Sequence, residues 1–239
     1  MKGMCSAAEA ALPGCQQEKR NSGGKPGSMH RSVYLSVPMA LAGQDGGAIA
    51  DPGGILVELG QSGGNQPTER RPVTSLLSRQ LADAGIQVAQ FTDLAPFDVL
   101  MLHPGRTLIE KLLRVNNFAL DETRRSIHGW PRIGRQLYDI WALLGDSQVC
   151  DFLADHGQAS EVLADCIRIS EDFMPDLAPP VGGFGACRAF DPDWEHSARL
   201  REEHDTAMLD LYYGLTPAPT YDDVIARVHD KAELLDLGT

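Results

Sequence analysis

The sequence of 239 residues lacks several features that would place it in a specialised class of protein. No stretch approaches 18 consecutive apolar residues, which excludes a transmembrane helix of the usual length. The five cysteines are scattered and form no CxxC pair, so neither a disulfide framework nor a zinc site is predicted. Residues 1–28 lack the sustained apolar segment that a signal peptide needs. These absences predict a soluble, cytoplasmic protein.

Three short segments look like known sites but fail on their details. The segment GGKPGS, residues 23–28, lacks the four-residue spacer of a phosphate-binding P-loop, and no strand pattern precedes it. Asp191 and Asp193 form an Asp-x-Asp, but the proline between them does not suit a central strand. His196 and His204 stand eight residues apart, which is not the HExxH spacing of zinc enzymes. We therefore assign no chemistry to these segments.

Charge is distributed unevenly along the chain. Residues 136–239 carry 21 acidic and 6 basic side chains, whereas residues 1–135 carry 12 acidic and 15 basic ones. A surface that binds nucleic acid is therefore expected in the N-terminal part, because the acidic part would repel phosphate. The simpler interpretation, a solvated acidic surface that aids solubility, is the one that composition alone favours.

The first hundred residues read as a disordered tail followed by strands. Residues 1–28 are rich in small and polar residues without periodicity, which predicts disorder. Alternating or apolar segments predict strands at 31–38, 54–60 and 95–104, and Glu58 is the one acid inside the second. Residues 62–72 read as a loop, and residues 72–85 as a helix with Pro72 in its first turn.

The rest of the chain reads as helical. Apolar stripes at helical spacing predict helices over 106–119 and 131–146, followed by several further helices in the acidic part. Strands first and helices afterwards predict an α+β fold with a C-terminal helical half. The corresponding division is a tail at 1–28, an α/β part at 29–145 and an acidic helical part at 146–239.

Lysine is scarce, and one lysine stands alone. Of the five lysines, only Lys111 lies between residues 26 and 230, near the border of an apolar stripe and three residues before Arg114. A compact ammonium beside a guanidinium suits a triphosphate. The simpler interpretation is a surface lysine whose stem covers apolar surface.

A second cluster lies on the helix predicted at 131–146. Arg132, Arg135 and Asp139 share the face opposite its apolar stripe. A carboxylate flanked by arginines can orient a hydroxyl or a phosphate, whereas the simpler interpretation is a surface pair between Arg135 and Asp139. Residues 106–135 hold seven bases and three acids, which marks this segment as the place where RNA or nucleotide phosphate would bind.

These segments resemble the AbiEii/AbiGii family of nucleotidyltransferase toxins from type IV toxin–antitoxin and abortive-infection systems. The resemblance rests on ILVELG, ERRPVTSLL, FDVLMLHPGRTLIEKLLRV and GRQLYDIWALL, of which HPGRTLIEKL is the most specific. It implies a nucleotidyltransferase-like fold with a small mixed sheet, transfer of a nucleotide from an NTP with Mg²⁺, an RNA acceptor such as tRNA, and a cognate antitoxin as partner.

The resemblance also implies roles for individual residues. Lys111 would contact the triphosphate, with Arg114 and Arg135 on the nucleotide side. Asp139 would be the catalytic acid carried by a helix, and Glu58 would be a third carboxylate able to hold metal. Gln136 stands where the family often has an acid or a histidine.

One family motif is not found. The family has a Gly-Ser turn followed about ten residues later by Asp-x-Asp, whose carboxylates hold metal ions, and no such segment precedes residue 30. This departure predicts a chain that is truncated at its start and weak in nucleotide transfer. The alternative is a non-catalytic remnant or binding module that engages an antitoxin or RNA.

Overall fold

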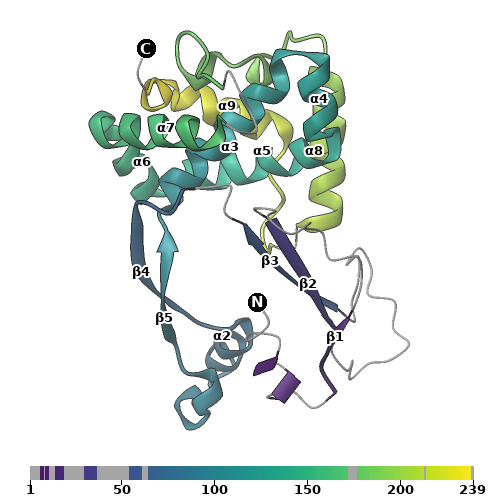
Figure 1. The fold of residues 1–239 in the computed structure, drawn as a ribbon, viewed down its shortest axis with the longest axis vertical. Coiled ribbons are helices and arrows are strands. Elements are labelled where there is room, and N and C mark those ends of the chain that lie inside the picture. Colours follow the sequence, from purple (N-terminus) through teal and green to yellow (C-terminus); the bar gives the residue numbers. More distant parts are fainter. Residues whose placement is uncertain are drawn as a thin grey trace.

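The chain folds into a helical part and a strand part. The computed structural model describes residues 6–7, 9–10, 14–18, 30–36, 54–60, 64–171, 177–212 and 214–237. Helices gather at one end of the molecule, and strands with one helix occupy the other (Figure 1). The α+β class predicted from the sequence is confirmed.

Three strands form a small antiparallel sheet. The strands are β1 (Gln16–Glu18), β2 (His30–Ser36) and β3 (Gly54–Gly60), in the order β1-β2-β3. Buried Cys15, Val33 and Leu35 pack with Val57 as a separate small core. Residues 14–18 therefore pack and pair, which corrects the prediction of disorder for that part of the tail. The rest of 1–28 lies outside the described residues, apart from short helical pieces at 6–7 and 9–10.

The second sheet is a two-stranded antiparallel ribbon. It pairs β4 (Thr68–Val73) with β5 (Phe97–Leu102), and between them lie α2 (Leu76–Asp83) and two short 3₁₀ turns at 88–90 and 92–94. Strand β5 was predicted, but β4 occupies residues predicted as a loop. Pro72 lies in β4, opposite Asp98, and α2 instead begins after Ser75, whose side chain caps it. Both described sheets are antiparallel.

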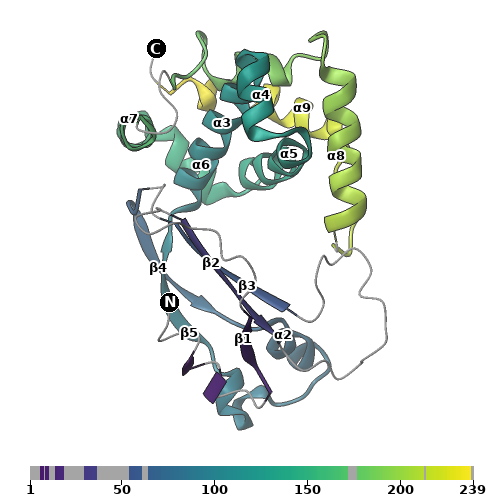
Figure 2. The ribbon, with the colours of Figure 1, turned by 45° about the vertical axis from the view of Figure 1, so that its right-hand side comes forward.

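The helical part is built from seven helices in the described chain. They are α3 (Pro104–Leu120), α4 (Glu122–His128), α5 (Trp130–Leu144), α6 (Ser147–Ala154), α7 (His156–Ser170), α8 (Ser197–Leu211) and α9 (Tyr221–Asp230). Short 3₁₀ turns lie at 184–186, 188–190 and 232–235. Figure 2 shows α8 upright at one side, with its C-terminal end directed toward the strand part.

One hydrophobic core holds these helices together. The predicted stripes of α3 and α5 are buried in it, as are apolar residues of α6, α7, α8 and α9. The axis of α5 passes close to α8, because a Cβ at Gly134 would lie 2.3 Å from the carbonyl oxygen of Glu203. The boundary predicted at residue 145 falls inside this core, between α5 and α6.

No helix in the described part of the chain is long and apolar enough to cross a membrane.

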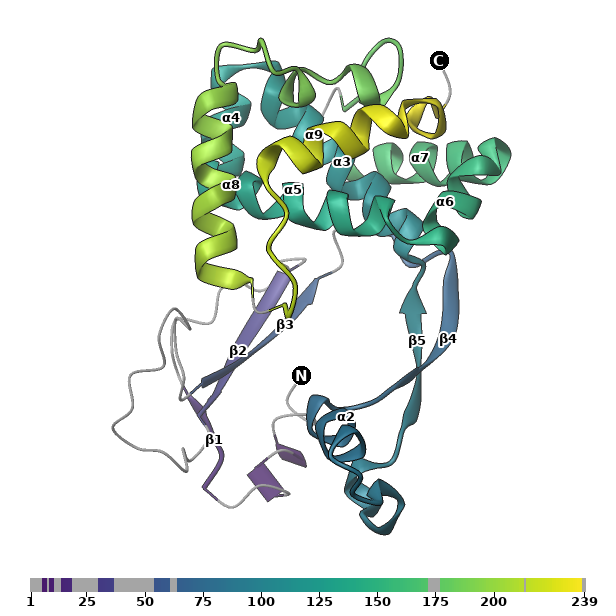
Figure 3. The ribbon, with the colours of Figure 1, turned by 180° about the vertical axis from the view of Figure 1, so that it is seen from behind.

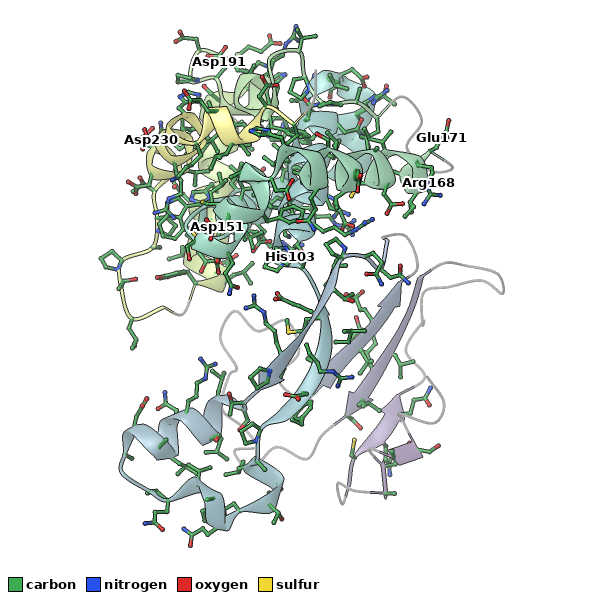
Figure 4. The ribbon with its side chains drawn as sticks, turned by 90° about the vertical axis from the view of Figure 1, so that its left-hand side faces the viewer. His103, Asp151, Arg168, Glu171, Asp191 and Asp230 are labelled. Atoms are coloured by element: carbon green, nitrogen blue, oxygen red, sulfur yellow. The ribbon has the colours of Figure 1, made fainter. Side chains whose placement is uncertain are left out.

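The chain passes from the ribbon into the helical part at His103, which follows β5 and caps α3 by accepting a hydrogen bond from the Gly105 amide. Figure 4 shows His103 where the two parts meet. The ring of His103 packs against Phe152 of α6, with 4.7 Å between their centroids.

Candidate functional site

Helix α3 places Lys111 at the edge of the core. Pro104 occupies the first turn of this helix, and the stripe that includes Leu108 and Leu112 is fully buried. Lys111 follows this stripe, so its stem lies against apolar surface while its ammonium reaches the neighbouring helix. Its side chain is 22% exposed.

The sequence predicted that Lys111 and Asp139 contribute to one site, and the structure brings them together. The Lys111 Nζ lies 2.6 Å from Oδ2 of Asp139 on α5 and donates a second hydrogen bond, of 3.0 Å, to Oε1 of Gln136. An ammonium has three donors, so one remains for a ligand. The Asp139 side chain is 39% exposed, so the pair is open to water on one side.

Two arginines lie beside this pair. Arg114 is three residues beyond Lys111 along α3, and Arg135 is four residues before Asp139 along α5, so each shares a helix face with its neighbour. Both are exposed, and neither forms an ion pair with any residue that the structure describes. The guanidinium groups of Arg114 and Arg135, together with the remaining donor of the Lys111 ammonium, provide positive charge for a phosphate.

A pocket opens next to Asp139. Its walls are formed by one turn of α5 and by the last turn of α8 with the residues that follow it, and its volume is about 530 Å³. The lining residues are Arg135, Gln136, Tyr138, Asp139, Met208, Leu211, Tyr212 and Gly214. Sequence reasoning missed the contribution of α8. No spacing pattern in the sequence links this helix to Asp139, so its contribution could be found only from the structure.

Glu58 is not joined to the other predicted site residues. It lies on β3, opposite Ser32 of β2, and its side chain is exposed. Within the described residues, no hydrogen bond or ion pair links Glu58 to Lys111 or Asp139. Its assignment as a metal ligand therefore stays a prediction from the resemblance.

The described residues do not provide a site that fits a divalent metal ion. No group of three or more histidines, cysteines, aspartates and glutamates comes together among them. Asp139 is the carboxylate of the site, and it is already paired with the Lys111 ammonium. Divalent metals in nucleotide-transfer sites are held by clustered carboxylates, so we assign no step through a metal to these residues.

The buried cysteines do not supply a reactive group. Burial raises the pKa of Cys166 and of Cys187 to about 12, so both remain thiols at neutral pH. Neither of these two thiols is therefore a nucleophile at neutral pH, and no cysteine is among the described residues that line the pocket beside Asp139.

Comparison with known proteins identifies the family. A sequence model of the family described as nucleotidyl transferase AbiEii toxin, type IV TA system, matches residues 5–227. Searches among curated proteins and among solved structures find no significant match. The matched span reaches from before β1 into α9 and includes Lys111 and Asp139. The chain therefore belongs to the AbiEii family of nucleotidyl transferase toxins of type IV toxin–antitoxin systems.

Proposed function

We propose that the chain binds a ribonucleoside triphosphate at Lys111, Arg114 and Arg135 and transfers its nucleotide to an RNA acceptor, with tRNA as the first candidate. Asp139 is the acidic group of this site. The described residues form no site for a divalent ion, so the proposed Mg²⁺ would be brought in by the triphosphate itself. A cognate antitoxin is the proposed partner that restrains the toxin. The observation that carries the proposal is the meeting of Lys111 and Asp139 at 2.6 Å beside two arginines that form no ion pair in the described chain.

The geometry supports a phosphate at this place. A triphosphate that approaches Lys111 meets one unused ammonium donor and the guanidinium groups of Arg114 and Arg135. Charge-assisted hydrogen bonds of this kind are about twice as strong as neutral ones. Asp139 lies at the other side of the ammonium, where it can accept a proton from an approaching hydroxyl.

A second candidate function is a nucleotide-binding or RNA-binding module that performs little transfer. The observation that favours it is the absence, among the described residues, of a carboxylate group able to hold metal. Positive charge attracts a nucleotide in its ground state, but it does not by itself lower the barrier to transfer. We therefore expect clear nucleotide binding and only weak transfer by this chain.

The test combines a labelling assay with a calorimetric titration of nucleotide binding by the same proteins. The chain is incubated with Mg²⁺, total tRNA and each of the four labelled ribonucleoside triphosphates in turn. We compare the wild type with Lys111→Ala, Asp139→Asn and the matched control Arg168→Ala. Arg168 is an exposed arginine on α7 whose partner is Asp165, so it tests the loss of a positive charge outside the site.

The outcomes separate the two candidates. Weak labelling of RNA that both site variants abolish and the control retains supports transfer at this site. Nucleotide binding without labelling, lost in Lys111→Ala, supports the binding module. Labelling that is equally strong in the wild type, Lys111→Ala and Asp139→Asn would overturn the proposed site.

A further inference from the structure

The pocket beside Asp139 has an aromatic wall that the phosphate-binding residues do not explain. Tyr138 on α5 and Tyr212 at the end of α8 both line it. Resting on the proposed function, we propose that this pocket receives the base of the nucleoside triphosphate, which stacks on the Tyr138–Tyr212 pair.

The size and lining of the pocket suit a flat ring. The volume of about 530 Å³ lies within the range of small-molecule sites, roughly 300–1,000 Å³. Met208 and Leu211 give it an apolar side, and both tyrosine side chains are partly exposed. An apolar pocket with an aromatic wall and a few polar groups at one edge is the usual surrounding of a bound base.

The two tyrosines form a preformed surface and leave no slot between them. Their ring centroids are 5.7 Å apart with an interplanar angle of 70°, an edge-to-face contact. A third ring between two stacked rings needs about 7 Å, twice the roughly 3.5 Å of a carbon–carbon contact. The base therefore lies on the free face of one ring.

Local contacts hold Tyr212 in place. Its hydroxyl group lies 3.0 Å from Oγ1 of Thr216, four residues further along the chain. A Cβ at Gly214 would lie 2.2 Å from the hydroxyl oxygen of Tyr212, so a larger residue there would displace the ring. Gly214 thus permits the position of the aromatic wall.

The pocket and the phosphate site share residues, which places them on one ligand. Gln136 and Asp139 line the pocket, and both are bonded to the Lys111 ammonium. A nucleotide whose phosphates contact Lys111 therefore has its base directed toward the tyrosines. Arg135 also lines the pocket, so its guanidinium group is available to the same ligand.

The experiment measures three ligands against matched variants. Calorimetric titration gives the Kd of ATP, of inorganic triphosphate and of a short RNA with a free 3′ end for the wild type, Tyr212→Ala, Tyr212→Phe, Gly214→Ala and Leu209→Ala. Leu209 lies on α8 but does not line the pocket, and its side chain is 86% exposed, so its variant controls for loss of apolar surface. Thermal unfolding of each variant checks that it folds.

We expect Tyr212→Ala to weaken ATP binding by roughly fivefold to 150-fold, because it removes an aromatic ring on which the base stacks. Gly214→Ala should give a loss in the same direction, since it displaces the ring. Inorganic triphosphate should bind all folded variants as it binds the wild type. Tyr212→Phe retains the ring and should restore ATP binding to within about twofold.

Four results would overturn the inference. ATP binding by folded Tyr212→Ala at wild-type strength is the first. An equal loss of ATP and triphosphate binding is the second, because it indicates damage to the phosphate site. Weakened binding of an RNA 3′ end with unchanged ATP binding is the third, since the pocket would then hold the acceptor. A wild type that binds neither ATP nor triphosphate is the fourth, and it alone also overturns the proposed function.

Discussion

At the scale of single residues, the most buried charged side chain in the described part of the chain lies away from the proposed site. The Arg106 side chain is 1% exposed and donates to the Gln66 carbonyl oxygen at 2.5 Å, to Asp165 at 2.8 Å and to Glu110 at 3.0 Å. It therefore ties the start of the ribbon to α3 and α7. A Cβ at Gly64 would lie 1.9 Å from its Nη2, so this backbone covers the guanidinium directly.

Replacing Arg106 should destabilise the fold. Arg106→Met removes the donors of a carbonyl and two carboxylates, and breaking a buried ion pair on one side costs about 3–5 kcal/mol. Because Asp165 and Glu110 are each about one third exposed, at 33% and 34%, water screens them in part and we expect a smaller loss, about 2–3 kcal/mol. Urea unfolding measures the change. Arg168→Ala, which removes a 69% exposed partner of the same Asp165, should cost about 0.5 kcal/mol or less.

Asp165 gives this network a pH dependence. The Arg168 and Arg106 hydrogen bonds hold the pKa of Asp165 below its ordinary value of 3.8. The stabilisation is therefore complete above the unfolded-state pKa and is lost as the pH falls through the lower folded-state pKa. Urea midpoints between about pH 2 and pH 6 should fall with acid in the wild type and fall less in Asp165→Asn. Parallel curves for the two proteins would contradict this assignment.

At the scale of elements, the helical stripes and strand β5 were predictable, and strand β4 was not. Apolar residues spaced three and four positions apart predicted α3 and α5. The same spacing predicted the side chains that are buried in the common core. Strand β4, Thr68–Val73, reads TERRPV, where charges and a proline hide the pattern. A two-stranded ribbon tolerates Pro72 because it has only edge strands, and this tertiary circumstance is not visible in the sequence.

The same limit applies to the candidate site. Lys111 and Asp139 could be chosen as polar residues on neighbouring amphipathic helices, and the structure pairs them. The α8 residues of the pocket could not be predicted from the sequence, because they are more than 60 positions away along the chain from Asp139. Their packing depends on the close approach of α5 and α8 at Gly134, which only the structure shows. The relation of Glu58 to the pair stays a prediction.

The α5–α8 crossing gives a test at this scale. Gly134→Ala would place a methyl group 2.3 Å from a backbone oxygen of α8, so the helices must separate. Overpacking of this kind costs about 1–3 kcal/mol and should also weaken ATP binding, since α8 forms one wall of the pocket. Gly157→Ala is the control: it meets only the Asp155 carboxylate at 3.5 Å, and alanine favours a helix. Thermal unfolding measures the stability of both variants. A Gly157→Ala variant that unfolds at a lower temperature than Gly134→Ala would contradict the close approach of α5 and α8.

At the scale of the whole molecule, basic and acidic helices share one core. The basic side chains of residues 106–135 lie on α3, α4 and α5, and the excess of acid lies in the chain from α6 onward, in its helices and in the segments that connect them. Figure 3 shows these helices gathered at one end of the molecule. Arg124 and Arg125 are paired with Asp121 and Glu122 of their own helix. The exposed arginines of α3 and α5 therefore carry the remaining positive charge.

This charge distribution predicts how RNA binds. The affinity for tRNA should fall linearly with the logarithm of salt concentration, because phosphate contacts release counterions. Arg114→Ala and Arg132→Ala should each reduce the magnitude of this slope by about one, which is the contribution of one phosphate contact. Arg168→Ala should leave the slope unchanged. Fluorescence anisotropy at a series of salt concentrations measures the slopes. Equal slopes for all four proteins would place the RNA elsewhere.

The central claim is that Lys111 and Arg135 contact the same nucleotide. The most direct measurement is a double-mutant cycle on the Kd of ATP, with the wild type, Lys111→Ala, Arg135→Ala and the double variant. Two groups on one phosphate chain are coupled, so each single change should weaken binding and the double change should cost less than their sum, by about 0.5 kcal/mol or more. Unchanged ATP binding in both single variants, or strictly additive losses, would contradict a shared site.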